Sequence, residues 1–362
     1  MVNKNNKKNN IIVLSINSLQ GAGAERFVLT MGRAFDVLGY DVHILCFDPT
    51  IEFTIDNELT YHLIDYKSYR WLPKGKVRYR LLAHKVDAYI LKHIGIPKLI
   101  LSNLERSYRV FSHSQLPNIV YVIHNTLSLL YKLNAKHVKP KLKEELKEIY
   151  SKHPCVCVSH GVKEDFINNF GNITPTSAIH NPIDREHINL LADEYDVEYK
   201  NYIIHVGSFK EAKRHDILLK AYAKTSKNLP LLLLGKGKLR GEIEKLVSEL
   251  NLEDKVIFLG FKDNPYPYIK NATLKVLTSE WEGFALVIPE ALALGVPVIS
   301  TDCPSGPNEL LPKNNLMPSN DIEAIATKLD KAMQNPKQFL ADFDDNLLPK
   351  VVALKYLELS AK

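Results

Sequence analysis

The sequence from Thr278 to Asp302 reads TSEWEGFALVIPEALALGVPVISTD, and the short, mostly apolar run Leu274–Leu277 (LKVL) precedes it. Short apolar runs of this kind predict buried strands, and the run Pro297–Ser300 predicts a second strand. Between the two runs, the residues around Glu290–Leu294 follow a helical pattern. A strand, a helix and another strand in succession predict parallel strands that are covered by a helix.

The same alternation of strands and helices extends along most of the 362-residue chain. It begins with the strand Ile11–Ser15 and is interrupted by a charged segment, Asp184–Asn201, after which it restarts. A chain of this length suits two domains of about 150 residues each. We therefore expect an α/β protein with two Rossmann-like, doubly wound parallel-sheet domains, residues 1–185 and 186–345.

The composition excludes several classes of protein. Hydrophobic residues make up 45% and charged residues 24% of the chain, as in ordinary folded proteins. The net charge of +6 is modest and no base-reading module is recognisable, so we expect no nucleic-acid partner. The apolar run Ile11–Ile16 is too short for a signal peptide, and no stretch approaches the ~18 apolar residues that span a bilayer. Together with only four cysteines, which fit reduced thiols, these features predict a cytoplasmic protein.

Two glutamates in the 278–302 segment are candidates for ligand binding. Pro289 is expected at the first position of the helix, which puts Glu290 in the first turn and leaves Glu282 in the preceding loop. Gly283 allows the backbone to approach a ligand closely, and the free N–H groups of a helix start favour phosphate. Amides for a diphosphate and carboxylates for hydroxyls suit a sugar nucleotide. In the alternative interpretation, Glu290 is stabilised only by the helix dipole and Glu282 is solvated.

This segment resembles the E-x7-E signature of the family 4 retaining glycosyltransferases. The resemblance implies a GT-B fold, in which two Rossmann-like domains face each other across a cleft and the last segment, residues 346–362, crosses back to the first domain. It also implies that Glu282 lies beside the transferred sugar and that Glu290 holds the ribose hydroxyls. Gly283 and Phe284 lie inside the signature and are expected to contact the donor.

Upstream, the sequence Val206–Tyr222 is similar to the strand, loop and helix that carry phosphate-binding cations in this family. Lys213 matches the lysine that contacts the diphosphate. The chain departs from the family at Ser208, where an arginine usually follows the glycine. The resemblance therefore leaves the second cation open, with Arg214 and Lys210 as candidates.

Other matches to the family are shorter. Gly306-Pro-Asn-Glu309 is similar to the family's G-x-x-E. In the N-terminal half, Gly21 and Gly23 belong to a glycine-rich loop that in the family lies near the donor phosphates and the acceptor. His124 resembles the strand-end histidine beside the reacting centre, and its alternative interpretation is a core histidine with satisfied hydrogen bonds.

The residues and the resemblance imply a retaining hexosyltransferase. Its donor is expected to be a nucleotide-sugar, a UDP-sugar in particular. Its acceptor is expected to be a glycan or a lipid-linked molecule of bacterial surface-polysaccharide or lipid-linked oligosaccharide synthesis. No His or Cys cluster has metal-ligand spacing, so we expect no cofactor and no metal requirement. The candidate catalytic residues are Glu282, His124 and Lys213, and the candidate donor-binding residues are Gly21, Gly23, Lys213, Arg214, Gly283, Phe284 and Glu290.

Two other functions stay open. Gly21-x-Gly23 after the first strand and Asp48 at the end of the second are features of a NAD(P)-dependent oxidoreductase, although Arg26 replaces the third glycine of that fingerprint. An inactive sugar-binding relative is the other alternative, because Ser208 departs from the family pattern.

The stretch Lys67–Leu104 is expected to be mostly helical. Its part from Lys67 to Lys98 contains nine Lys or Arg residues and one acid, Asp87, with aromatic residues interleaved. Such a basic amphipathic helix is typical of membrane-surface elements, so we expect peripheral, salt-sensitive attachment to the inner face of the membrane. The alternative is an ordinary solvated face over the core of the first domain. In a helix, one side would carry Arg78, Lys85 and Lys92, and another would carry Leu82, Val86 and Ile90.

Overall fold

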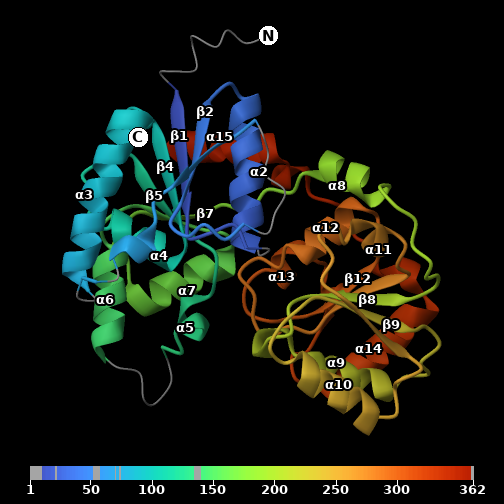
Figure 1. Ribbon diagram of the computed structural model, residues 1–362. Helices are drawn as coiled ribbons and strands as arrows, with labels where there is room; N and C mark the ends of the chain where they lie inside the picture. The colour runs from blue at the N-terminus through green and yellow to red at the C-terminus, as the bar shows by residue number, and fades with distance from the viewer. Residues whose placement is uncertain are drawn as a thin grey trace. The chain divides into compact units, whose positions relative to one another are not determined.

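The computed structural model describes residues 10–20, 23–51, 58–69, 71–72, 75–133 and 140–359. The chain forms two compact units, which are shown in Figure 1. Unit 1 comprises Met1–Pro182 and Asn346–Lys362, and unit 2 comprises Ile183–Asp345.

Unit 1 is built on a seven-stranded sheet in the order β3-β2-β1-β4-β5-β6-β7, and each neighbouring pair is parallel. Strands β1, β4 and β5 are buried along their whole length. Continuously apolar strands are expected where helices cover both faces of a parallel sheet. The strands are β1 Ile11–Ile16, β2 Asp41–Cys46, β3 Thr60–Leu63, β4 Leu99–Asn103, β5 Ile119–Ile123, β6 Cys155–Cys157 and β7 Thr176–Ala178.

Helices cover both faces of this sheet, with α3 and α4 on one side and α2 on the other (Figure 1). Helix α15 packs against α2, where the rings of Phe27 and Tyr356 meet edge to face with their centroids 5.9 Å apart. The C-terminal segment thus belongs to unit 1. The helices of unit 1 are α2 Gly23–Val37, α3 Lys76–His93, α4 Leu104–Phe111, α5 Leu127–Leu130, α6 Pro140–Tyr150, α7 His160–Phe170 and α15 Pro349–Leu359.

Strand β4 corrects the expectation that Lys67–Leu104 is mostly helical. Its residues form a central strand, paired with β1 on one side and with β5 on the other. A short apolar run fits a buried strand and a buried helix equally well, so periodicity alone did not distinguish them. Pro97, shortly before the strand, is the signal that argues against a helix continuing from α3.

Unit 2 contains a six-stranded sheet in the order β10-β9-β8-β11-β12-β13, again with parallel pairs. The two doubly wound parallel sheets predicted from the sequence are therefore confirmed. The strands are β8 Ile203–Val206, β9 Leu231–Leu234, β10 Val256–Gly260, β11 Leu274–Leu277, β12 Val298–Thr301 and β13 Leu316–Met317. The helices are α8 Arg185–Ala192, α9 His215–Ala223, α10 Arg240–Glu249, α11 Tyr266–Lys270, α12 Val287–Ala293, α13 Pro307–Leu310 and α14 Ile322–Gln334.

Each sheet has a topological switch point, which is the strand from which the order of strands proceeds in opposite directions along the sheet. In unit 1, β1 lies between β2 and β4, and in unit 2, β8 lies between β9 and β11. Ligands of doubly wound sheets bind outside the carboxyl ends of the strands at such a point. The loops that follow β8 and β11, and those that follow β1 and β4, are therefore the places where functional residues are expected.

The apolar side of α3 that the sequence predicted is part of the protein core. Leu82, Val86 and Ile90 are fully buried in unit 1. This agrees with the alternative interpretation, a helix that covers the core of the first domain. Among the helices of the described ranges, none is both long and apolar enough to cross a membrane.

The prediction that one side of α3 is basic and exposed is wrong at Arg78. Arg78 is buried, and its guanidinium donates to the Tyr66 hydroxyl, at 3.3 Å, and to the Leu72 carbonyl oxygen. It therefore does not share an exposed side with Lys85 and Lys92. An arginine that finds internal acceptors can be turned inward although its sequence spacing suggests a solvated side.

Candidate functional site

The loops after β8 and β11 meet at the switch point of unit 2. Lys213, at the end of the short 3-10 helix η2 (Glu211–Lys213), forms an ion pair with Glu282, with an Nζ–Oε1 distance of 2.6 Å. The Ser279 hydroxyl donates to the same carboxylate oxygen at 2.6 Å. The side chains of Lys213 and Glu282 are 20% and 10% exposed. The fold thus joins two of the predicted catalytic residues that are 69 positions apart in sequence.

Hydrogen bonds to the backbone hold these two loops together. The Glu280 N–H donates to the Ala212 carbonyl oxygen at 2.8 Å. The Thr278 hydroxyl lies 3.3 Å from the carbonyl oxygens of Lys213 and Arg214. Because the backbone on both sides is fixed, the ion pair is held in a defined geometry, as a preorganised site requires.

Arg214 has a different set of partners from Lys213. Its φ of 46° lies in the left-handed region, which is uncommon for residues other than glycine. Its guanidinium donates to Asp216 at 3.0 Å, to Glu280 at 3.4 Å and to the side-chain oxygen of Asn320. The hydrogen bond to Asp216 raises the pKa of Arg214 above its ordinary value. This candidate donor-binding residue is therefore engaged by two carboxylates of unit 2.

Glu290 lies in the first turn of α12 and is only 3% exposed. The Tyr266 hydroxyl of α11 lies 3.4 Å from Glu290 Oε1 and donates to it. The sequence predicted Pro289 as the first residue of this helix. The helix begins at Val287, so Pro289 is its third residue. Proline is still tolerated there, because the first four N–H groups of a helix have no partner within it. Sequence reasoning missed Tyr266, since nothing in its neighbourhood points to a glutamate 24 positions away.

The signature loop is shaped by a glycine from the second motif. Gly306 has a φ of 106°, and a Cβ atom there would lie 2.7 Å from the Phe284 carbonyl oxygen. Phe284 is itself buried, as is Gly283. Ala285 has a φ of 59°, a conformation that costs an L-residue free energy. The G-x-x-E motif therefore supports the E-x7-E loop through direct backbone packing.

Two glycines after β9 likewise allow two loops to pack closely against each other. A Cβ atom at Gly235 would lie 2.0 Å from the Gly207 carbonyl oxygen, and one at Gly237 would lie 2.4 Å from the Phe209 carbonyl oxygen. These glycines therefore allow the loop after β9 to pack on the loop that contains Ser208. Close packing of two loops accounts for them without a phosphate.

In unit 1, His124 follows β5 and contacts the last residue of β4, Asn103. The Asn103 amide nitrogen donates to the carbonyl oxygens of Ser15, at 3.1 Å, and of Leu101, at 3.0 Å. Its oxygen therefore faces His124 Nε2, at 2.8 Å, and accepts a hydrogen bond from it. His124 thus carries its proton on Nε2 and offers Nδ1 as an acceptor.

Burial lowers the pKa of His124 to about 3, so the ring is neutral at neutral pH. The ring of Phe27 packs against it edge to face, with centroids 5.1 Å apart. One nitrogen is satisfied, as in the core-histidine interpretation, and the other keeps the acceptor capacity that a cleft role needs. Asn103 was missed because β4 was predicted to be helical.

The remaining predicted residues of unit 1 are less informative. Gly21 lies outside the described residues, and Gly23 is the exposed first residue of α2. Asp48, the acid of the oxidoreductase alternative, accepts hydrogen bonds from the Thr50 N–H, at 3.2 Å, and the Thr50 hydroxyl, at 2.6 Å. The hydroxyl contact is the largest cause that lowers the pKa of Asp48. A local turn therefore accounts for this aspartate.

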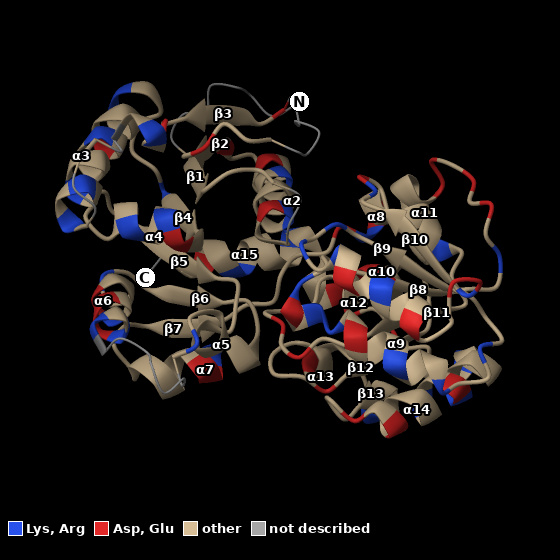
Figure 2. Cartoon of the chain, turned by 60° about the horizontal axis from the view of Figure 1, so that its bottom comes forward, with Lys and Arg blue, Asp and Glu red and all other residues tan. Residues whose placement is uncertain are grey.

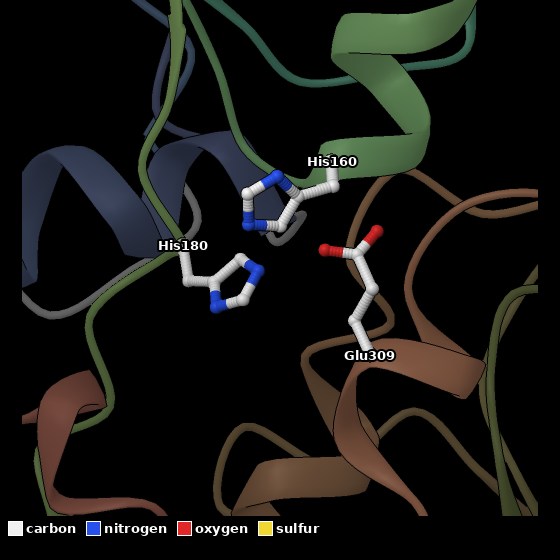
Figure 3. Close-up of side chains that lie close together, drawn as sticks. All are labelled: His160, His180 and Glu309. Carbon is white, nitrogen blue, oxygen red and sulfur yellow. The ribbon is translucent and has the colours of Figure 1, made fainter.

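Two histidines of unit 1 face each other in Figure 3. His160 begins α7 and His180 follows β7, and their ring centroids are 5.6 Å apart at an interplanar angle of 89°. Glu309, which is labelled in the same view, belongs to unit 2. Two imidazoles are fewer than the three or four protein ligands of typical zinc sites, so the pair alone does not define a metal centre. That the protein needs no metal stays a prediction.

Comparison with known families assigns both halves of the chain. The family described as glycosyl transferases group 1 matches residues 192–346, and Glycosyltransferase Family 4 matches residues 21–187.

Two relatives illustrate the match. The chain is 30% identical to the N-acetylgalactosamine-N,N'-diacetylbacillosaminyl-diphospho-undecaprenol 4-alpha-N-acetylgalactosaminyltransferase of Campylobacter jejuni, over 94% of this chain and 98% of that enzyme. It is 29% identical to the lipopolysaccharide 1,6-galactosyltransferase of Salmonella typhimurium, over 63% of this chain and 70% of that enzyme.

Solved structures share the fold. The Anabaena HepE protein, crystallised with UDP and glucose, superposes with a TM-score of 0.73 at 17% identity and covers 97% of this chain and 95% of its own. The sucrose-phosphate synthase of Thermosynechococcus elongatus superposes with a TM-score of 0.72 at 21% identity, covering 97% and 94%. At such identities the likeness establishes the fold alone.

Proposed function

The chain belongs to the family 4 glycosyltransferases and has their GT-B fold, and from this premise we propose that it is a retaining enzyme that uses a nucleotide-sugar donor. The observation that carries the proposal is the Lys213–Glu282 ion pair at the switch point of unit 2, with Glu290 in the adjacent helix. Family membership sets aside the oxidoreductase alternative. The donor is proposed to be a UDP-sugar, in keeping with the UDP in the Anabaena structure.

Lys213 is proposed to stabilise the diphosphate. Breaking the bond between the anomeric carbon and the diphosphate oxygen leaves negative charge on the nucleotide, and a fixed cation favours that state more than the ground state. Without a donor, the Lys213 ammonium pairs with Glu282. A bound diphosphate would compete for the same ammonium and leave the Glu282 carboxylate to contact sugar hydroxyls.

The other residues have proposed roles that follow from their protonation and burial. Glu290 is shielded, so its carboxylate suits the two hydroxyls of a ribose, with Tyr266 positioning it. The neutral His124 ring suits a sugar hydroxyl, because its Nδ1 can accept a hydrogen bond from that hydroxyl. A neutral ring would attract a diphosphate poorly. The acceptor oxygen bonds to the anomeric carbon from the face that the diphosphate leaves, and the acceptor proton passes to the departing phosphate oxygen.

The acceptor is proposed to be a glycan carried on a lipid in bacterial surface-polysaccharide or lipid-linked oligosaccharide synthesis. The Campylobacter relative is named for a diphospho-undecaprenol acceptor, and the Salmonella relative is named for lipopolysaccharide. Both names place a sugar acceptor on a lipid. We therefore propose a cytoplasmic enzyme that attaches peripherally to the inner face of the membrane.

Donor consumption by the purified protein tests the proposal. UDP-, GDP- and ADP-sugars are supplied in turn, nucleotide release is measured, and the anomeric configuration of the product is read by NMR. We expect release from UDP-sugars, retention of configuration, and loss of release in Glu282→Gln. Glu253→Gln, at an exposed position of unit 2, is the matched control and should keep activity.

Three outcomes would contradict the proposal. Release from another nucleotide would reject the UDP donor, and an inverted product would reject retention. No release with any donor would restore the inactive sugar-binding alternative.

A further inference from the structure

Arg214 follows Lys213 directly and forms the joint between the short helix η2 and helix α9. Its N–H donates to the Glu211 carbonyl oxygen at 3.1 Å, and its carbonyl oxygen accepts hydrogen bonds from the N–H groups of Ile217 and Leu218, at 3.1 and 3.2 Å. The φ of 46° at this joint is unfavourable for a residue with a side chain, whereas glycine adopts it without strain. An arginine at this position indicates that its side chain makes contacts that offset the strain.

The Arg214 side chain connects three segments of unit 2. Its Nε and Nη2 atoms donate to the two carboxylate oxygens of Asp216 on α9, at 3.0 and 3.1 Å, which is a bidentate geometry. Its Nη1 atom donates to Glu280, in the loop after β11, at 3.4 Å, and to the side-chain oxygen of Asn320, which precedes α14. Figure 2 shows acidic and basic positions interspersed around α9 and α12 of this unit. A bidentate pair within such a network fixes its members better than a single surface ion pair does.

These contacts make Arg214 a poor ligand for a phosphate. The four hydrogen bonds use four of the five N–H groups of the guanidinium. Two carboxylates, those of Asp216 and Glu280, face its single positive charge. The charge is therefore balanced within the protein, and a diphosphate would have to displace both carboxylates. Lys213 differs, because the carboxylate that it pairs with, Glu282, is the one that the proposed mechanism releases to the sugar.

The segments that Arg214 connects are the ones that hold Lys213 in place. The aliphatic part of the Lys213 side chain lies close to Gly207, where a Cβ atom would be 3.6 Å from its Cγ and Cδ atoms. A lysine side chain is long and flexible, so its ammonium is located only as well as its backbone is held. That backbone is the peptide between Lys213 and Arg214, and the Arg214 guanidinium ties it to the loop after β11 through Glu280.

We propose that Arg214 is a positioning residue for Lys213, an inference that rests on the proposed role of Lys213 at the diphosphate. The guanidinium holds η2 and α9 against the loop after β11, and the Lys213 ammonium is thereby kept where the departing diphosphate develops charge. A cation that is fixed in advance stabilises this charge without reorganisation. Loosening it lowers the rate although the cation is still present. Arg214 itself makes no contact with the donor.

Substitution of Arg214 and of its partner Glu280 tests the proposal by steady-state kinetics. Arg214→Gln should lower kcat/KM about tenfold, because the ammonium of Lys213 is misplaced. Glu280→Gln should lower it about threefold, and the double variant should lose no more than Arg214→Gln alone, since both changes break the same link. The control is Lys224→Gln with Glu323→Gln, an exposed 2.6 Å ion pair of unit 2, which should behave like the parent.

An arginine that binds phosphate directly gives a different result. Freed from one carboxylate in Glu280→Gln, Arg214 would bind the diphosphate at least as well as before. Parental or higher kcat/KM in Glu280→Gln, together with a loss in Arg214→Gln, would therefore overturn the positioning role.

Calorimetric titration with UDP shows whether the effect passes through Lys213. Arg214→Gln should weaken UDP binding about fivefold in the parent, and by less than about twofold in a Lys213→Ala background. An equal loss in both backgrounds would mean that Arg214 contacts UDP itself, and would overturn the proposal. Parental UDP affinity and kcat/KM in Arg214→Gln, with only a lower free energy of unfolding in urea, would leave Arg214 a role in stability alone and would overturn it too.

The same measurements keep this inference separate from the proposed function. If the parent releases nucleotide from no donor, the proposed function fails, while the UDP titrations still decide the role of Arg214. If Lys213→Ala weakens UDP binding but Arg214→Gln does not, the proposed function stands and the positioning role fails. Parental UDP affinity in Lys213→Ala would remove the role of Lys213 at the diphosphate and the positioning role with it.

Discussion

The two sheets have the same arrangement of strands at their switch points but carry opposite chemistry there. In unit 2 the loops after β8 and β11 hold a cation and a carboxylate, Lys213 and Glu282, 2.6 Å apart. In unit 1 the ends of β4 and β5 hold two neutral groups in contact, Asn103 and the ring of His124. The fold therefore provides the position, and the side chains decide what can be bound there.

This contrast suits two different ligands. A diphosphate needs fixed positive charge, and contacts with charged groups contribute about 1.5–3 kcal/mol each. Sugar hydroxyls need neutral donors and acceptors, whose net contribution is about 0.5–1.5 kcal/mol each. We expect substitutions in unit 2 to have larger effects on catalysis than substitutions in unit 1.

The largest effect is expected for Lys213→Ala. Loss of the cation that faces the departing diphosphate should lower kcat/KM by about a hundredfold or more. Affinity for UDP should fall about tenfold, because the charge-assisted contact is lost in the ground state too. The measurements are steady-state kinetics and calorimetric UDP titration, with Lys220→Ala, exposed on α9, as the control. Parental UDP affinity in Lys213→Ala would show that the donor site is misassigned.

A somewhat smaller effect is expected for Glu290→Gln. This substitution keeps the size of the buried side chain but removes its charge, so affinity for the nucleotide should fall about tenfold. Tyr266→Phe removes only a 3.4 Å hydrogen bond to the same carboxylate and should cost no more than about threefold. Unfolding curves of both variants are the control for stability. Equal losses in the two variants would mean that Tyr266 contacts the substrate itself.

The sequence predicted unit 2 better than unit 1 for physical reasons. The glutamates and Lys213 follow short strands that are mostly apolar, β11 and β8, so both the fold and the site follow from local pattern. In unit 1 the strand β4 was hidden in a stretch that also fits a helix, and its polar terminal residue Asn103 was lost with it. Arg78 shows the same limit, because only the tertiary structure supplies the acceptors that turn it inward.

Contacts between segments that are distant in sequence could not be predicted at all. The position of Tyr266 beside Glu290, and of Gly306 against the Phe284 backbone, depends on how α11, α12 and α13 pack. Periodicity and spacing describe each segment separately, so they identify the signature residues but not the residues that support them. The glycine of G-x-x-E was recognised as a motif, yet its steric role appears only in the fold.

A pH effect on stability should distinguish the neutral cluster of unit 1. The pKa of His124 is lowered to about 3 in the folded protein, while an unfolded histidine titrates near 6.5. Below about pH 6.5 the unfolded state binds a proton that the folded state does not, so the free energy of unfolding should fall as the pH falls from about 6.5 to 3. Each such histidine contributes a slope of up to about 1.4 kcal/mol per pH unit.

The measurement is urea unfolding at several pH values, for the parent and for His124→Gln. The variant should lose one histidine's share of the slope, whereas His84→Gln, at an exposed position of α3, should leave it unchanged. An unchanged slope in His124→Gln would show that the imidazole is not kept neutral by burial, and the contrast between the two switch points would then disappear.

The smallest expected effect is that of chelation. If Lys213 supplies the positive charge for the diphosphate, no divalent cation is needed in that role, and nucleotide release should continue at the parental rate in EDTA. Added Mg²⁺ or Mn²⁺ should change the rate by less than about twofold, through general screening of charge. Inhibition by EDTA that Mn²⁺ reverses would contradict this assignment. His160→Ala would then be the variant to compare, since His160 and His180 are two imidazoles close enough to contribute ligands. If Lys213 shared its role with a metal ion, Lys213→Ala should also lower kcat/KM much less than the hundredfold expected above.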